Sequence, residues 1–154
     1  MTVGDVSRDF VAALINIDMN VVSRWAEDKN LSFSTFTDLS QKSEVAELLR
    51  QEIQRVNSFL PEHARVQRFA NFPKELDPDE GELTRTRKLR REFLEKRYAV
   101  VIEGLYAAAE TVDIDIPVTY QDGRQGNLVA CVALYDTVEN APKRENNSTQ
   151  RRAA

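Results

Sequence analysis

The sequence predicts an α+β fold, in which helices flank a small mixed β-sheet and a C-terminal β-hairpin extends that sheet. Two observations predict this class. Some segments repeat their apolar residues at the spacing of an amphipathic helix, whereas others alternate apolar and polar residues as a half-buried strand does. In addition, an Asp-Gly pair, which is a strong hairpin signal, lies between the last two strand-like segments.

The first half of the chain contains strand and helix patterns in turn. Phe10–Ile17 is apolar and rich in β-branched residues, which predicts a strand, and Thr2-Val3 suggests the first arm of a hairpin with it. Apolar residues at helical spacing predict a helix over Met19–Lys29, with Trp25 in its core-facing stripe. Thr35–Ser40 is interpreted as a polar connector.

A second helix is predicted to begin at Ser43, which can cap it, and to end before Pro61. Its apolar residues recur in steps of three and four, which places them on one face. They are Val45, Leu49, Ile53, Val56 and Leu60. Val66–Phe72 then alternates as a strand does, and Pro73 ends it.

Lys74–Thr86 is punctuated by proline and glycine and is predicted to be a loop. Arg87–Ala108 is predicted to be the longest helix. Its apolar stripe consists of Leu94, Tyr98, Val101, Leu105 and Ala108.

The C-terminal part predicts the hairpin. Residues 112–120 alternate with period two, Gln121–Arg124 supplies the turn, and residues 127–138 return as the second strand. Residues 1–139 are therefore expected to form one domain, and the polar residues 140–154 a disordered tail.

Composition sets further limits on the protein. A chain of 154 residues with 42% hydrophobic and 30% charged residues fits one soluble globular domain. No apolar run could cross a bilayer and no signal-peptide pattern is present, so we expect a cytoplasmic protein without a transmembrane segment. The net charge of −4 argues against nonspecific nucleic-acid binding, although it allows a local basic patch.

Only one cysteine and one histidine are present. The single cysteine excludes an internal disulfide and suits a reducing compartment, and no zinc site of the usual His/Cys type can form within one chain. We expect no metal site. Cys131 is interpreted as a small core residue of its strand, and His63 as a surface residue in a turn.

The run Glu80–Arg91 turns abruptly from acidic to basic at the predicted start of a helix. A lysine there, among arginines and threonines, is well placed to hold an anion. Basic residues at a helix N-terminus oppose the helix dipole, which favours a functional reason for them. The simpler alternative is a solvated basic helix start that pairs with the acidic loop before it.

Residues 74–91 resemble the last conserved motif of the AMP-forming acyl-CoA synthetases, a group of adenylate-forming enzymes, in the form found in the long-chain fatty-acid CoA ligases. Smaller motifs in the same order extend the resemblance over about residues 1–138. They are Val3-Gly4-Asp5, Ala13-Leu14-Ile15, Trp25-Ala26-Glu27, Val56-Asn57 and Glu95-Lys96-Arg97-Tyr98.

The resemblance implies that the chain is the small C-terminal lid domain of such a ligase. The family converts a fatty acid, ATP and CoA into acyl-CoA, AMP and pyrophosphate. ATP, magnesium and the fatty acid bind a large N-terminal adenylation domain, which this chain is expected to lack together with the hinge between the two domains. We therefore expect the chain alone to bind no cofactor and to be inactive.

By its place in the motif, Lys88 matches the family's adenylation lysine. A mobile cation can contact both the substrate carboxylate and the α-phosphate of ATP, which repel each other as they approach. The loop expected near the nucleotide consists of Thr84, Arg85, Thr86, Arg87, Arg90 and Arg91. Arg87 departs from the family, because many relatives carry a small residue directly before the lysine.

Other residues have simpler interpretations. Asp77, Asp79, Glu80 and Glu82 do not follow the spacing of a calcium-binding EF-hand, and a solvated acidic loop explains them better. Tyr98 either packs in its helix stripe or contacts the absent domain, and packing is favoured.

Three hypotheses about the whole molecule follow. The chain is a lid separated from a full ligase, a free-standing subunit that completes an N-terminal domain in trans, or a non-catalytic module whose basic patch binds a membrane surface or nucleic acid. Surface left exposed by the missing domain, and an unpaired first strand, also predict some tendency to form a homodimer.

Overall fold

The strands form one mixed sheet in the computed structural model, which describes residues 1–119 and 123–138. Its order is β1-β2-β3-β5-β4; β2 and β3 are parallel and the other neighbours antiparallel. The strands are β1 (Thr2–Val3), β2 (Val11–Ile15), β3 (Val66–Asn71), β4 (Thr111–Thr119) and β5 (Gln125–Asp136). The helices are α1 (Met19–Asp28), α2 (Phe36–Ser40), α3 (Ser43–Asn57), α4 (Arg91–Arg97) and α5 (Ala99–Tyr106), with a 3₁₀ turn at Glu62–Ala64. The predicted α+β fold with a mixed sheet and a C-terminal hairpin is confirmed.

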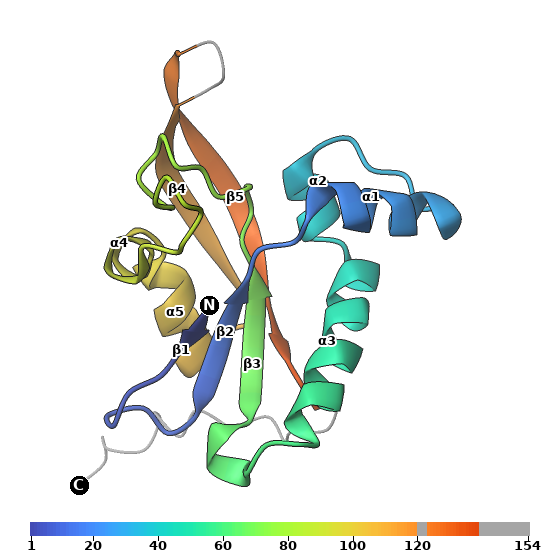
Figure 1. Cartoon of the computed structure of the whole chain (residues 1–154), viewed down its shortest axis with the longest axis vertical. Helices are drawn as coiled ribbons and strands as arrows, with labels where there is room; N and C mark the ends of the chain where they lie inside the picture. The colour runs from blue at the N-terminus through green and yellow to red at the C-terminus, as the bar shows by residue number, and fades with distance from the viewer. Residues whose placement is uncertain (120–122, 139–154) are drawn as a thin grey trace, which may run out of the picture.

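Helices cover both faces of the sheet (Figure 1). The segment α1–α3 connects the parallel strands β2 and β3 and lies on one face, whereas α4 and α5 lie on the other. Alternation along β2 produces this division, since successive side chains of a strand point to opposite faces. Ala12 and Leu14 pack in the core under α4 and α5, and Ala13 between them packs against α3.

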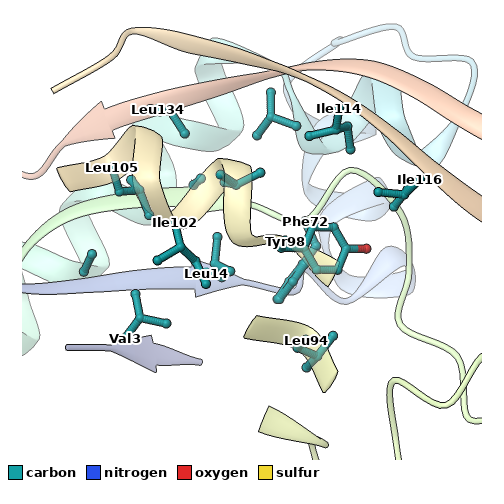
Figure 2. Close-up of a cluster of buried hydrophobic side chains, with 14 of the residues drawn as sticks. Val3, Leu14, Phe72, Leu94, Tyr98, Ile102, Leu105, Ile114, Ile116 and Leu134 are labelled. Carbon is teal, nitrogen blue, oxygen red and sulfur yellow. The ribbon is translucent and has the colours of Figure 1, made fainter. Parts of the chain in front are cut away.

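The larger core lies between the sheet and the helices α4 and α5 (Figure 2). Leu14, Leu94 and Leu105 are almost completely buried there. The ring of Phe72 meets that of Tyr98 edge-on, with 4.9 Å between centroids, which is a favourable aromatic geometry. Each large apolar side chain buried in this way contributes about 1.5–3 kcal/mol. This core fixes α4 and α5 on the sheet.

A buried arginine joins β3 to the end of α5. The Nη atoms of Arg68 donate to the carbonyl oxygens of Leu105 and Ala109, both at 2.7 Å, and its Nε donates to Asp136 at 2.8 Å. The last carbonyls of a helix have no partner within the helix. Arg68, a residue of the sheet, therefore supplies hydrogen-bond donors to carbonyl groups at the C-terminal end of α5.

The first half of the chain largely follows the sequence prediction. The pairing of β1 with β2, helix α1, and the partly buried position of Trp25 against the core of α1–α3 are confirmed. The predicted connector at Thr35–Ser40 is wrong, because residues 36–40 form α2, whose Asp38 N–H donates to the Thr35 hydroxyl. The segment therefore consists of a capping threonine, Thr35, and a short helix rather than a loop.

Two details of α3 also differ. Its N-cap is Lys42, and the Ser43 hydroxyl donates to the Glu44 carboxylate rather than capping the helix. Val56, predicted on the apolar face, is 50% exposed, and the helix ends at Asn57, before the predicted end.

The predicted long helix over Arg87–Ala108 is wrong at its start and in its middle. Helix begins only at Arg91, and it is divided at Tyr98, whose φ and ψ are −107° and 24°. The longest helix is α3 instead. The apolar stripe is confirmed for Leu94, Tyr98, Val101 and Leu105, all of which are buried.

The C-terminal hairpin is confirmed by the pairing of β4 with β5 from Thr111↔Ala133 to Thr119↔Gln125. Residues 120–122 of the predicted turn and residues 139–154 of the predicted tail lie outside the described residues. Cys131 was predicted in the core but is exposed, because it lies on the face of β5 opposite to Val132 and Leu134. His63 is exposed, as predicted.

Gly104 allows α5 to approach the hairpin strands closely. A Cβ atom there would lie 2.6 Å from Val112 Cγ1 and 2.9 Å from Leu134 Cδ1. Both distances are too short for carbon atoms not bonded to each other, so a side chain at this position would force Val112, Leu134 or the helix to shift.

We therefore expect Gly104→Ala to destabilise the protein, although alanine favours helix. Overpacking of about 1–3 kcal/mol should exceed the helix-propensity gain of about 1 kcal/mol. Chemical denaturation measures the loss. Val100→Ala, at a 59% exposed position of the same helix, is the matched control and should change stability little. Equal effects of the two substitutions would contradict this explanation.

Candidate functional site

Lys88 lies in the second arm of a tight hairpin and not in a helix. The Thr84 N–H donates to the Lys88 carbonyl at 2.8 Å, and the Lys88 N–H donates to the Thr84 hydroxyl at 3.0 Å. The Arg87 N–H closes the turn on the Thr84 carbonyl at 2.9 Å, and Leu83 bridges Leu89. The Lys88 carbonyl, which a helix starting at Arg87 would pair with a later N–H, is thus already used, which explains why α4 begins later.

Arg87 has a φ of +60°, in the left-handed region. Glycine adopts this conformation without cost, whereas a residue with a Cβ is strained there. The backbone thus gives a physical reason for a small residue before the lysine. Arg87 departs from that residue type while keeping the turn that favours it.

The hairpin presents its basic side chains to solvent. Arg85, Thr86, Arg87 and Lys88 are exposed. Within residues 1–119 and 123–138, no carboxylate lies within ion-pair distance of the Lys88 ammonium group. The amine is therefore available to an anion on another molecule.

The two remaining arginines of the predicted loop, also exposed, lie apart from the hairpin. The guanidinium of Arg90 stacks over the ring of Phe93, 5.6 Å from its centroid. Arg91 begins α4 and donates to the carbonyl of Thr2 at 3.0 Å. The structure thus groups Thr84, Arg85, Thr86, Arg87 and Lys88, whereas Arg90 and Arg91 connect the hairpin to the domain.

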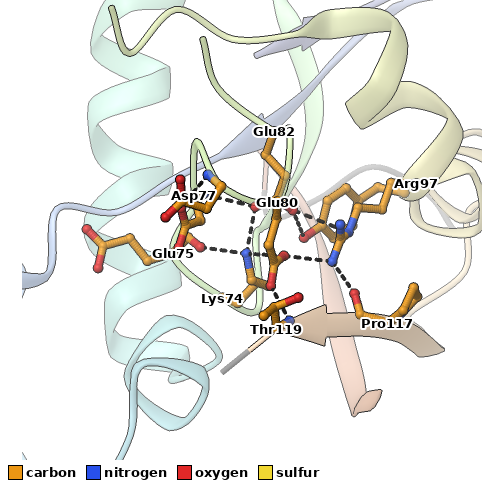
Figure 3. A network of polar contacts seen from close by, with 10 residues as sticks. Lys74, Glu75, Asp77, Glu80, Glu82, Arg97, Pro117 and Thr119 are labelled. Atoms are coloured by element: carbon orange, nitrogen blue, oxygen red, sulfur yellow. Dashed lines mark hydrogen bonds and ion pairs between the residues drawn. The ribbon is translucent and has the colours of Figure 1, made fainter. Parts of the chain in front are cut away.

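A cluster of four charged residues lies at the base of the hairpin (Figure 3). We call Lys74, Glu80, Glu82 and Arg97 the charge cluster. Lys74 Nζ is 2.6 Å from Glu82 Oε2 and 3.1 Å from Glu80 Oε2. Arg97 Nη2 is 2.8 Å from Glu80 Oε2, and its Nε is 3.3 Å from Glu82 Oε1. Each carboxylate thus faces both cations.

Glu82 is the most enclosed member, because its side chain is 0% exposed. It also accepts from the Asp77 N–H at 3.0 Å and from the Tyr98 hydroxyl at 3.2 Å. Burial, together with the nearby Glu82 carboxylate, raises the pKa of Tyr98 far above its usual range, so the phenol stays a donor.

Glu80 ties the charge cluster to the edge of the sheet. Its Oε1 accepts from the Thr119 N–H of β4 at 2.7 Å, and Arg97 donates to the Pro117 carbonyl of the same strand. Burial opposes ionisation of Glu80, but the bonds from Thr119 and Lys74 outweigh it, so the pKa of this carboxyl lies below its ordinary value of 4.5. A shallow cavity of about 390 Å³ adjoins Glu80 and Arg97.

The interpretation of the acidic segment as solvated is wrong for two of its residues. Asp79 is exposed, but Glu80 and Glu82 are 6% and 0% exposed at their side chains. The cations that neutralise them are Lys74, at the start of the loop, and Arg97, at the end of α4, so the local sequence around the two carboxylates does not reveal the pairing. Tyr98 packs in the core as predicted, and its hydrogen bond to Glu82 was not foreseen.

No group of side chains among the described residues has the composition of a metal site. The buried carboxylates of Glu80 and Glu82 are already neutralised by Lys74 and Arg97. None of the helices that the structure describes is long and apolar enough to cross a membrane.

Comparison with known proteins identifies the domain. The family described as AMP-binding enzyme C-terminal domain matches residues 31–110, which include both the Lys88 hairpin and the charge cluster. The chain belongs to this family. It is 25% identical over 107 residues to proteins named long-chain-fatty-acid–CoA ligase FadD15 of Mycobacterium tuberculosis and Mycobacterium bovis. The match covers 69% of this chain but 18% of each relative, and no solved structure matches significantly.

The charge cluster makes the stability of the fold depend on pH. Because folding lowers the pKa of Glu80, its contribution is present above the ordinary value of 4.5 and is lost as the pH falls. We expect Glu80→Gln to lower the free energy of unfolding at neutral pH and to weaken its decline toward about pH 3. Chemical denaturation across this range measures both effects.

The matched control is Glu75→Gln, which removes the same charge from an exposed position on the same loop. The free energy of unfolding of this variant should equal that of the parent protein at each pH. If Glu80→Gln and the parent lost stability in parallel on acidification, Glu80 would not be a source of the dependence.

Proposed function

We propose that this chain is the C-terminal lid domain of a long-chain fatty-acid CoA ligase and supplies Lys88 as the adenylation lysine. The complete reaction converts a fatty acid, ATP and CoA into acyl-CoA, AMP and pyrophosphate. The family match and the names of the two mycobacterial relatives support this proposal. The observation that carries it is the exposed amine of Lys88, on a hairpin inside the matched region, with no carboxylate of the described residues within ion-pair distance.

The chemistry explains the choice of a lysine. In the first half-reaction a carboxylate oxygen attacks the α-phosphorus of ATP, a P–O bond forms, and pyrophosphate leaves with the electrons of the broken bond. Both reacting groups are negative, so an ammonium group that contacts both stabilises the transition state. In the second half-reaction the CoA thiol attacks the acyl carbon, loses its proton, and AMP leaves.

The chain spans about a fifth of the length of the curated relatives it matches. We propose that an N-terminal adenylation domain, in the same or a separate polypeptide, binds the fatty acid, ATP, CoA and magnesium. The described residues offer no cluster that fits magnesium. The single cysteine suits a reducing compartment, and the proposal places the protein in the cytoplasm.

The test is ATP–pyrophosphate exchange with palmitate. The chain alone should show no exchange, and exchange should appear when it is combined with the N-terminal adenylation domain of a long-chain ligase. Lys88→Ala should lower that exchange by about 100-fold or more, because one contact to the developing charge is lost. Lys96→Ala, at an exposed lysine of α4, is the matched control and should keep it. Exchange by the isolated chain, or full exchange with Lys88→Ala, would overturn the proposal.

The alternative is a non-catalytic module whose basic hairpin binds an anionic surface. It predicts salt-sensitive sedimentation with vesicles of anionic phospholipid, lost when Arg85, Arg87, Arg90 and Arg91 are changed to Gln. We expect no such sedimentation under the lid proposal. Vesicle binding that disappears with these substitutions, together with failure of the exchange assay, would favour the alternative.

Self-association also stays a prediction. β1 lies at one edge of the sheet, and Val129 on the open face of the C-terminal hairpin is 73% exposed. Unpaired edges and exposed apolar residues favour contact between copies.

A further inference from the structure

We propose that Glu82 is a positioning residue for Lys88: its buried carboxylate, held by Lys74 and Arg97, fixes the base of the hairpin that carries the lysine. The inference rests on the proposed function for the role of Lys88. The effect on the hairpin, however, can be measured without any enzymatic activity.

The hairpin cannot orient itself. Its backbone hydrogen bonds between Thr84 and Lys88 close the turn but join no other element. The side chains of residues 85–88 are exposed, and the Thr86 hydroxyl bonds the Thr84 hydroxyl of the same hairpin. The direction in which Lys88 points must therefore be set where the two arms leave the domain.

Glu82 lies at that point. Its carbonyl oxygen accepts from the Arg90 N–H at 3.0 Å, which joins the two arms below the Leu83–Leu89 bridge. Its own N–H donates to the Asp77 carbonyl at 3.2 Å. The backbone of one residue thus connects the first arm, the second arm and the preceding loop.

The side chain of Glu82 anchors this junction to the rest of the domain (Figure 3). Lys74 holds it from the start of the loop after β3, and Arg97 and Tyr98 hold it from the junction of α4 and α5. Arg97 in turn donates to the Pro117 carbonyl of β4. The base of the hairpin is fixed through one carboxylate to three separate parts of the fold.

Loss of the negative charge should release this anchor. With Glu82→Gln, Glu80 is the carboxylate that remains to pair with Lys74 and Arg97. The new amide also places N–H donors against the former partners of Glu82, such as Lys74 and the Asp77 N–H, which are donors themselves. The closing of the hairpin depends on bonds that remain, so it stays formed but moves more freely relative to the core.

Limited proteolysis tests this, because trypsin cuts after basic residues and needs a mobile backbone. The hairpin and its exit contain several such sites: Arg85, Arg87, Lys88 and Arg90. Glu82→Gln should raise cleavage at these sites about tenfold, while cleavage after Arg24 and Arg55 in α1 and α3 stays unchanged. Tyr98→Phe, which removes one donor to the same carboxylate, should give a smaller increase at the same sites.

The matched control is Glu75→Gln. Glu75 belongs to the same loop, but its carboxylate points away from the charge cluster and is exposed (Figure 3). It should leave every cleavage rate unchanged. If Glu82→Gln and Tyr98→Phe left the hairpin as resistant as the parent, the proposal would be wrong. Equal acceleration at all sites would make Glu82 a general stabilising residue and would also overturn it.

The exchange assay adds a second readout. In the chain combined with an adenylation domain, Glu82→Gln should lower kcat of ATP–pyrophosphate exchange about tenfold and leave KM for ATP unchanged, because only the placement of Lys88 is disturbed. If Glu82→Gln loosened the hairpin but left kcat unchanged, Glu82 would not position Lys88 for the reaction. Absent exchange in the parent combination would count against the proposed function, whereas the proteolysis result would still decide whether Glu82 fixes the hairpin.

Discussion

The arrangement of this domain around its candidate site depends on one buried carboxylate. Glu82 has no solvent exposure, and removing a charge from water costs several kcal/mol unless partners replace the water. Lys74 and Arg97 provide that replacement from sequence positions on either side of it. The loop after β3, the junction of α4 and α5, and the edge strand β4 are consequently held in one relative placement.

The sequence predicted well those elements whose formation depends on apolar periodicity. Helix α1, the β1–β2 hairpin, β3 and the long C-terminal hairpin each contain a local pattern that matches their burial. It failed where hydrogen bonds outweigh periodicity. The sequence prediction starts the long helix at Arg87, but the Lys88 carbonyl, which a helix would pair with a later N–H, accepts from the Thr84 N–H instead, and helix begins only at Arg91.

For the candidate site, the exposure of Lys88 could be predicted from the basic run. The buried ion pairs that hold the base of its hairpin could not. Glu80 and Glu82 look like any acidic loop in sequence, because their neutralising partners are brought in by tertiary structure. Arg97 lies in the motif Glu95-Lys96-Arg97-Tyr98, which indicates no role for it, and the sequence indicates only packing or a contact with the absent domain for Tyr98. A loop carboxylate cannot be recognised as buried until the cations around it are known, and that knowledge requires the fold.

The edge of the sheet at β4 is also affected by the charge cluster. β4 is an outermost strand nine residues long, and such a strand offers free N–H and C=O groups to any passing chain. At Thr119 the N–H is taken by Glu80, and at Pro117 the carbonyl is taken by Arg97. Side chains at this edge thus form hydrogen bonds that a neighbouring strand would otherwise form. The exposed residues Asp113 and Asp115 place negative charge farther along the same strand. The ion pairs at the base of the Lys88 hairpin thus also leave fewer unpaired backbone groups on this edge of the sheet, where another chain could add a strand.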